Sequence, residues 1–99
     1  MRVLPITDRV IPRAQEVLAS LMDADLRAEV DVRNEKIGHK IREAQLEKVP
    51  FMLVIGDREA ESGSVSVRSR SRGDLGVSAV DSFISMAREL VSSRSRDNS

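Results

Sequence analysis

The sequence contains no cysteine, tryptophan or tyrosine, and only one histidine and two phenylalanines among its 99 residues. The absence of cysteine excludes disulfide bonds, cysteine-based metal sites and thiol catalysis. The single His39 cannot form a histidine cluster, which argues against a metalloenzyme or a Ser-His-Asp hydrolase. The scarcity of aromatic side chains also excludes the stacking platform of an RNA-recognition sheet. Any RNA binding would therefore depend on hydrogen bonds and charge.

The chain also has no net charge, because sixteen basic side chains balance sixteen acidic ones. It therefore lacks the basic excess of a strong nonspecific nucleic-acid binder. The longest apolar run, P-F-M-L-V-I-G, is too short to cross a bilayer, and no leader-like segment opens the chain. We expect a cytoplasmic protein without membrane contact. Its length fits one domain with a single core and no deep cleft.

Hydrophobic periodicity predicts alternating strands and helices in the first half of the chain. The apolar segment over 2–7 is typical of a strand, and the spacing over 11–21 predicts a helix. Alternation over 26–32 predicts a half-buried strand, followed by a helix with Asn34 as its N-cap. The run over 51–55 is apolar at every position, which indicates a central strand. This β-α-β-α-β order favours an α/β fold with parallel neighbours in the sheet.

The pattern changes after the central strand. Residues 56–63 are rich in turn-forming and charged types, so we expect a connection without a helix and then a hairpin-like return. Helical spacing resumes over 80–91. We expect residues 1–92 to form the domain and residues 93–99 to be a flexible tail. The strand predicted after the connection places three arginines on the face away from the core: Arg68, Arg70 and Arg72.

Gly38 is unexpected within a predicted helix, where glycine costs roughly 1 kcal/mol relative to alanine. Gly38, Arg42 and Gln45 share one side of that helix. Either a polar ligand approaches the backbone at Gly38 while Arg42 supplies forked donors, or Gly38 accommodates a neighbouring element and Arg42 is solvated. Lys36 lies in the first turn, where a cation opposes the helix dipole, and this favours an anionic partner. Lys40 is spaced for ion pairs within the helix, and we interpret it as structural.

The arginines at 68, 70 and 72 repel one another unless acids or phosphates lie opposite them. Glu59 and Glu61, on the preceding connection, could supply the acids. An arginine beside a glutamate also suits unpaired bases, because a guanidinium can donate to guanine and a carboxylate can accept from a base N–H. A solvated charged strand is the alternative interpretation.

Several motifs occur in a specific order: L-P-I-T-D-R, then E-V-D-V-R-N-E-K-I-G-H-K-I-R-E-A-Q-L-E-K-V-P-F-M-L-V-I-G-D-R-E, then E-S-G-S-V-S-V-R-S-R and G-D-L-G. Together they resemble the C-terminal anticodon-binding domain of threonyl-tRNA synthetase, a class II aminoacyl-tRNA synthetase, over residues 2–91. The resemblance implies a five-stranded mixed sheet flanked by three helices. One departure is Asp25, where this family usually has glycine, so a left-handed turn would be less comfortable there.

The resemblance further implies that the domain reads the anticodon loop of threonine tRNA, principally its second and third bases, G and U. It implies five RNA-contacting residues: Asn34, Lys36, Arg42, Glu59 and Arg68. The class II catalytic motifs are missing, so the chain by itself should not aminoacylate and should hold no cofactor. ATP and zinc are expected only in the remainder of the synthetase, and the full-length enzyme is expected to be a homodimer.

Two other functions remain open on the sequence. The chain could be the anticodon domain of a prolyl, glycyl or histidyl synthetase, although the R-N-E-K-I-G block and the combination of Glu59 with Arg68 favour the threonyl enzyme. It could instead be a structural or dimerisation domain that keeps the fold without binding RNA. A separate α/β enzyme finds no support, because no nucleophile and base form a defensible pair.

Overall fold

A five-stranded mixed sheet forms the centre of the computed structural model, which describes the backbone of residues 1–33 and 35–97 and the side chains through residue 89, except at position 34. The strand order is β2-β1-β3-β4-β5. β1 is parallel to β2 and β3, whereas β4 is antiparallel to both β3 and β5. The mixed sheet confirms the expected fold class. The strands are β1 (Arg2–Pro5), β2 (Glu29–Val30), β3 (Phe51–Ile55), β4 (Ser64–Ser69) and β5 (Gly73–Ala79).

The helices include the three expected ones and one that the sequence pattern missed. The helical elements are η1 (Asp8–Val10), α1 (Ile11–Asp23), α2 (Ile37–Leu46), α3 (Asp57–Ser62) and α4 (Val80–Asp97). The expectation of a helix-free connection over 56–63 was wrong, because α3 lies there. Glu59 stabilises its first turn by accepting a hydrogen bond from the Gly56 N–H at 2.9 Å. Gly63 ends it in the left-handed conformation, with φ of 68°.

Several predicted boundaries also differ from the structure. The strand expected over 26–32 is reduced to two residues, and α2 begins at Ile37 with Lys36 in the cap position, not Asn34. Arg70 and Arg72 lie in the turn between β4 and β5, so only Arg68 of the arginine row belongs to the strand. The backbone is helical to residue 97, and the flexibility of residues 93–99 stays a prediction.

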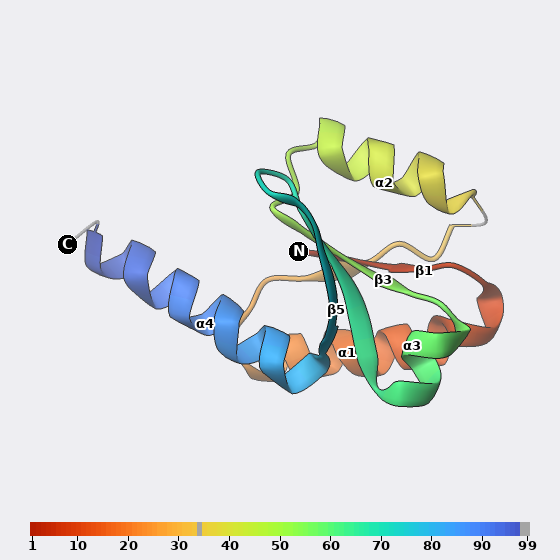
Figure 1. Cartoon of the computed structure of the whole chain (residues 1–99), viewed down its shortest axis with the longest axis horizontal. Helices are drawn as coiled ribbons and strands as arrows, with labels where there is room; N and C mark the ends of the chain where they lie inside the picture. The colour runs from red at the N-terminus through yellow and green to blue at the C-terminus, as the bar shows by residue number, and fades with distance from the viewer. Residues whose placement is uncertain (34, 98–99) are drawn as a thin grey trace.

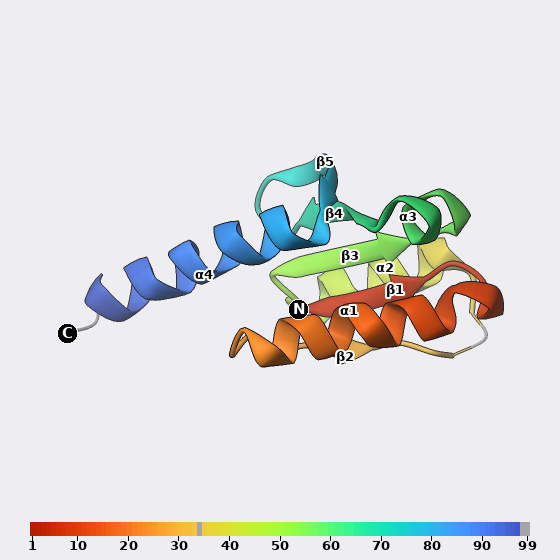
Figure 2. The same ribbon diagram turned by 90° about the horizontal axis from the view of Figure 1, so that it is seen from below.

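Three helices cover one face of the sheet and α2 covers part of the other. Figures 1 and 2 show α1, α3 and α4 on the same side, with α4 extending beyond the sheet. The larger core joins these helices to alternate residues of β1, β3 and β4, as the two-residue side-chain period of a strand requires. Its buried members are Val3, Val10, Ala14, Val17, Leu21, Leu26, Leu53, Ile55, Val65, Val67, Phe83 and Ala87.

The smaller core lies between α2 and the opposite face of β1 and β3. Its buried members are Leu4, Ala44, Met52 and Val54, with Ile37, Ile41 and Val49 packed around them. These residues come from the sheet near its β1–β3 centre and from the apolar stripe of α2. α2 is therefore anchored over only two strands of the five.

The turn after α1 confirms the conformation suspected at Asp25, whose φ is 61°. Aspartate adopts this left-handed conformation more readily than most residues. Within the described part of the chain, no helix has the length and apolar character that spanning a membrane requires. The same residues contain no group of three or more His, Cys, Asp or Glu side chains that could hold a metal ion.

Leu53→Ala tests the larger core. Leu53 is fully buried in β3, so its truncation should lower the free energy of unfolding by about 2–5 kcal/mol. Val77→Ala is the matched control in the same sheet, because Val77 is 64% exposed and its truncation should change stability by less than about 0.5 kcal/mol. Urea unfolding followed by circular dichroism gives both values. Equal losses for the two variants would contradict the placement of the core.

Candidate nucleic-acid interface

Polar contacts tie one flank of α2 to the β1–β2 side of the sheet. Arg2, almost buried at the start of β1, donates to Glu29 of β2 at 2.6 Å and to Glu47 just after α2 at 2.7 Å. These two carboxylates raise the pKa of Arg2 further above its ordinary value, mainly through the hydrogen bond to Glu47. The same contact lowers the pKa of Glu47. The C-terminal end of α2 is thus held beside β1 and β2.

A second set of contacts holds the N-terminal half of α2 on the same flank. Lys40 is only 3% exposed, and its Nζ donates to the carbonyl oxygens of Asp31 at 3.1 Å and Pro5 at 3.3 Å. Arg33 pairs with Asp31 at 2.8 Å and also with Glu43. The structural interpretation of Lys40 is confirmed, but its partners are backbone carbonyls, not acids of its own helix.

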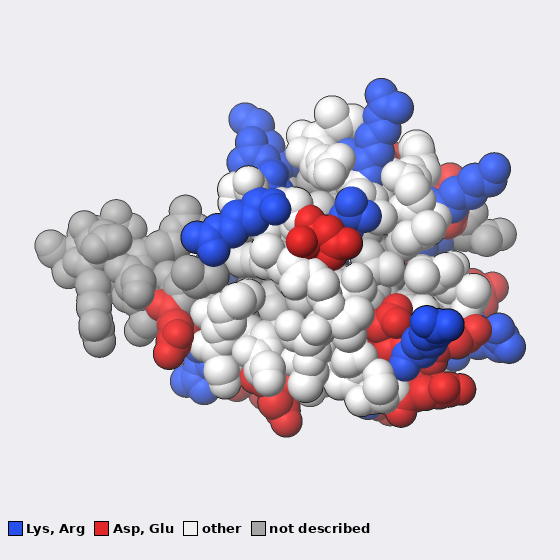
Figure 3. All heavy atoms as spheres, viewed as in Figure 1, with Lys and Arg blue, Asp and Glu red and all other residues white. Residues whose placement is uncertain are grey.

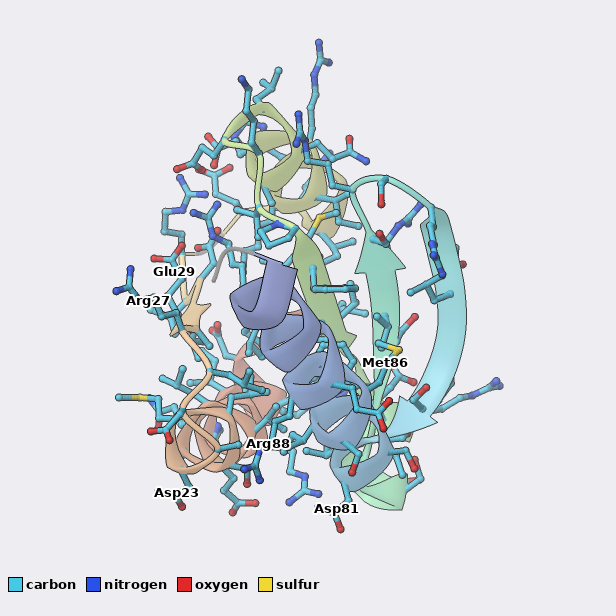
Figure 4. All side chains as sticks on the ribbon, turned by 90° about the vertical axis from the view of Figure 1, so that its left-hand side faces the viewer. Asp23, Arg27, Glu29, Asp81, Met86 and Arg88 are labelled. Carbon is cyan, nitrogen blue, oxygen red and sulfur yellow. The ribbon has the colours of Figure 1, made fainter. Side chains whose placement is uncertain are left out.

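The opposite flank of α2 carries Gly38, Arg42 and Gln45, all exposed. At about 3.6 residues per turn, these three positions lie nearly opposite Lys40, Glu43 and Glu47 on the helix. Because the latter group faces β1 and β2, the former group faces the side of β4 and β5. Figure 4 shows the elements on either side of the helix, with α2 at the top, β2 on the left beside Glu29, and the two later strands on the right.

The sheet face beside this flank is not covered by a helix among the described residues. Arg68 of β4 pairs with Met52 of β3, so its side chain lies on the α2 side of the sheet. Ser66 and Val77 pair with each other on the same side, and Val77 is 64% exposed. We call these residues and the free flank of α2 the α2–β4 surface: Gly38, Arg42, Gln45, Ser66, Arg68 and Val77.

The two arginines of the α2–β4 surface have free donors. No carboxylate of the described residues lies within 4.0 Å of the Arg42 or Arg68 side-chain nitrogens, in contrast to Arg2 and Arg33. Arg42 is exposed and Arg68 is half-buried. Each guanidinium can therefore present its planar, forked donors to an oxygen-rich or base-edge ligand. This favours the ligand-binding interpretation of Arg42.

Basic side chains gather along one side of the molecule despite its zero net charge. Figure 3 shows many of them projecting over α2 and the β4–β5 turn, with one acidic group beside them over β5, whereas most other acidic side chains of this face lie along the opposite side and near α3. The basic group includes Lys36, Arg42, Lys48, Arg70 and Arg72, all exposed. A local positive field of this kind attracts polyanions even when the whole chain is neutral.

The structure places the sequence-predicted residues on three elements. Lys36 is exposed at the entrance of α2, Arg42 lies on the helix and Arg68 on the sheet. Asn34 lies outside the described residues. Glu59 is in α3, beyond the end of β3, whereas Arg68 pairs near the start of that strand. Glu59 and Arg68 are therefore separated by most of the length of β3 and do not form an adjacent pair.

Comparison with known proteins identifies the family and the fold. A family model described as "Anticodon binding domain" matches residues 1–90. The chain belongs to the anticodon-binding domain family. The resemblance seen in the sequence motifs is confirmed, because the similar curated proteins are threonine–tRNA ligases.

Two such ligases illustrate the extent of the match. The ligase of Symbiobacterium thermophilum is 53% identical over 96 residues, which cover 97% of this chain and 15% of that protein. The ligase of Caldanaerobacter subterraneus subsp. tengcongensis is 56% identical over 84 residues, or 85% of this chain and 13% of that protein. This anticodon-binding domain therefore spans a small part of the length of the ligases it matches.

A solved structure agrees with the fold. The RNA binding domain of threonyl-tRNA synthetase from Cryptosporidium parvum Iowa II superimposes with a TM-score of 0.79 at 30% identity. The match covers 84% of this chain and 21% of that chain. The five-stranded mixed sheet is thus shared with an RNA-binding domain.

Sequence patterns missed one residue of the α2–β4 surface. Val77 joins it only through strand register, which no local motif specifies, whereas the alternation along β4 already places Ser66 on the same face as Arg68. Asp31 falls on the polar side of the alternation over 26–32, but in the structure it is only 9% exposed and lies directly after β2. The available signal was that an aspartate side chain often accepts a hydrogen bond from the backbone N–H two residues later, here that of Arg33.

Gly38→Ala tests why α2 contains a glycine. A Cβ at Gly38 would meet no described atom within 4 Å, so alanine should raise the free energy of unfolding by up to about 1 kcal/mol. Gly63→Ala is the control and should lower it by about 1 kcal/mol or more, because φ there is 68°. Thermal unfolding distinguishes the two. Destabilisation by Gly38→Ala would show that the position packs against a neighbouring element after all.

Asp31→Asn tests the electrostatics beside α2. The hydrogen bonds from Arg33 hold the pKa of Asp31 below its ordinary value, with a smaller contribution from Lys40. A carboxyl group whose pKa is lowered in the folded state stabilises the fold. This contribution is complete at pH values above the ordinary carboxyl pKa and disappears as pH falls through the lowered pKa. Asp31→Asn should therefore lower stability at neutral pH and flatten its decline in acid. Stability curves from pH 7 to 2 measure this, with the exposed Asp23→Asn as control; parallel curves for wild type and Asp31→Asn would contradict it.

Proposed function

We propose that this chain is the anticodon-reading module of a threonine–tRNA ligase and that it binds the anticodon loop on the α2–β4 surface. The observation that carries the proposal is the convergence of Arg42 and Arg68 on one side of the sheet, both with free donors. The family match and the similarity to threonine–tRNA ligases support the same conclusion. RNA loops are recognised in this way, by splayed bases whose edges meet protein side chains.

The side chains have separable roles in this proposal. Arg68 donates to the guanine of the anticodon, since a guanidinium matches the O6 and N7 acceptors of that base. Asn34, Lys36 and Arg42 hold neighbouring bases or phosphates along α2. Glu59, which lies outside the α2–β4 surface beyond the end of β3, accepts from the N–H of a more distant base through the carboxylate oxygen not used by Gly56. The hydrogen bond to Gly56 fixes the direction of that carboxylate before RNA arrives.

Aminoacylation belongs to the rest of the ligase in this proposal. The described residues contain no metal-ligand cluster, and ATP, zinc and the homodimer contacts are assigned to the remainder of the chain. The RNA is met in the cytoplasm, where protein synthesis takes place. The domain contributes anticodon selection and no chemistry.

Arg68→Ala tests the proposal directly. Its effect should depend on the base: loss of one bidentate contact costs about 1–3 kcal/mol with the threonine anticodon stem-loop and little with a stem-loop whose guanine is replaced. Arg72→Ala, in the adjacent exposed turn, is the matched control and should weaken both RNAs equally while reducing the salt slope by about one. Fluorescence anisotropy at two salt concentrations measures these affinities.

Each outcome of this experiment has a definite meaning. Equal weakening of both RNAs by Arg68→Ala would reduce Arg68 to a charge contact. A wild-type chain that binds neither RNA, or that cannot distinguish them at any salt concentration, would reject anticodon reading and favour a structural or dimerisation domain. Preference for a proline, glycine or histidine anticodon would assign the chain to a related synthetase.

A further inference from the structure

The segment between β2 and α2 is closed by hydrogen bonds at its beginning. The Asp31 side chain is only 7% exposed and accepts three hydrogen bonds from Arg33. The donors are the backbone N at 3.1 Å, Nε at 2.9 Å and Nη2 at 2.8 Å. The Glu35 N–H then donates to the Arg33 carbonyl at 2.9 Å. These bonds fix the backbone on both sides of position 33.

The same segment is tied to α2 and to β1. Arg33 also pairs with Glu43 on the second turn of α2. Lys40 reaches the carbonyl oxygen of Asp31 from α2 and, through the same ammonium group, the carbonyl of Pro5 in β1. Two basic side chains thus connect a short loop to a strand and a helix. Lys36 lies at the end of this loop, and Asn34 follows Arg33 directly.

Arg33 differs from Arg42 and Arg68 because its donors are already used. Its guanidinium donates to Asp31 and pairs with Glu43, and these contacts lower the pKa of both carboxyl groups. If Arg33 moved to a phosphate, it would leave the buried Asp31 carboxylate without its main partner, which is costly. The arginine that precedes Asn34 is therefore poorly suited to contact RNA itself.

We propose that Arg33 is a positioning residue that, together with Asp31, Glu43 and Lys40, fixes the loop that leads to the entrance of α2, from which Lys36 reaches the anticodon. This inference rests on the proposed function. One guanidinium at position 33 pairs with two carboxylates, those of Asp31 and Glu43, and this requires the planar, forked donors of arginine. A lysine keeps the charge but can no longer make this set of contacts. Charge alone should therefore fail to replace Arg33.

Arg33→Lys in the 99-residue chain is the test, and Arg27→Lys, at an exposed arginine outside the candidate surface, is the matched control. The first variant should bind the threonine anticodon stem-loop roughly tenfold more weakly, a loss typical of residues coupled in one network. Its affinity for a stem-loop with a substituted guanine should fall by a similar factor, because the proposal assigns the guanine to Arg68 and not to this loop, and the salt slope should stay the same. Amide hydrogen exchange in the free protein should accelerate at position 33 and at Glu35. The control should alter none of these quantities.

A second variant keeps the test valid if Arg33→Lys does not fold. Glu43→Gln leaves the buried Asp31 contact in place and should reproduce the change in exchange and affinity more weakly, with circular dichroism confirming the fold. Unchanged exchange in both variants, or unchanged affinity of Arg33→Lys for the threonine anticodon stem-loop, would overturn the inference. If the wild-type chain fails to distinguish the RNAs, the proposed function fails, whereas the exchange result still shows whether Arg33 fixes the loop.

Discussion

The placement of α2 is the constraint on which the candidate surface depends. An apolar stripe alone would hold the helix against β1 and β3 but would leave its rotation and tilt weakly specified. The contacts of Arg2 with Glu47 and of Lys40 with two carbonyl oxygens act at opposite ends of the helix and on the same flank. They fix which side of α2 faces β2. The side with Arg42 must then face the open part of the sheet.

This arrangement also explains how a neutral chain presents a basic surface. Four acids beside α2 are used by internal partners, because Glu29 and Glu47 pair with Arg2 while Asp31 and Glu43 pair with Arg33. Arg42 and Arg68 have no salt bridge among the described residues, although Asp74 of β5 lies opposite Arg68 in the sheet. Net charge therefore says little about the field at the candidate surface, which depends on how the ion pairs are distributed. The balanced counts of basic and acidic residues argued against strong nonspecific binding of polyanions but did not exclude a local basic site.

Much of the fold follows from local sequence patterns. The fully apolar run over 51–55 and the helical spacing over 11–21 identify β3 and α1, because burial on a sheet or helix imposes those periods. α3 was missed because its six residues show no apolar stripe and its start depends on Gly56 and Glu59. Arg42 and Arg68 were identified individually, but their common side follows from helix rotation and strand register. Those are tertiary properties that one short motif cannot specify.

The scarcity of aromatic residues determines what the surface must do to be selective. Stacking on aromatic rings tolerates any base, whereas hydrogen bonds to base edges distinguish one base from another. A surface with forked donors and no aromatic platform therefore lacks the affinity that stacking provides for any base, and its selectivity depends on exact placement of its donors. Placement is costly when donors lie on a loop, because the loop loses conformational freedom on binding. The Asp31–Arg33 contacts order that loop in the free protein, so less of this entropy remains to be lost when RNA binds.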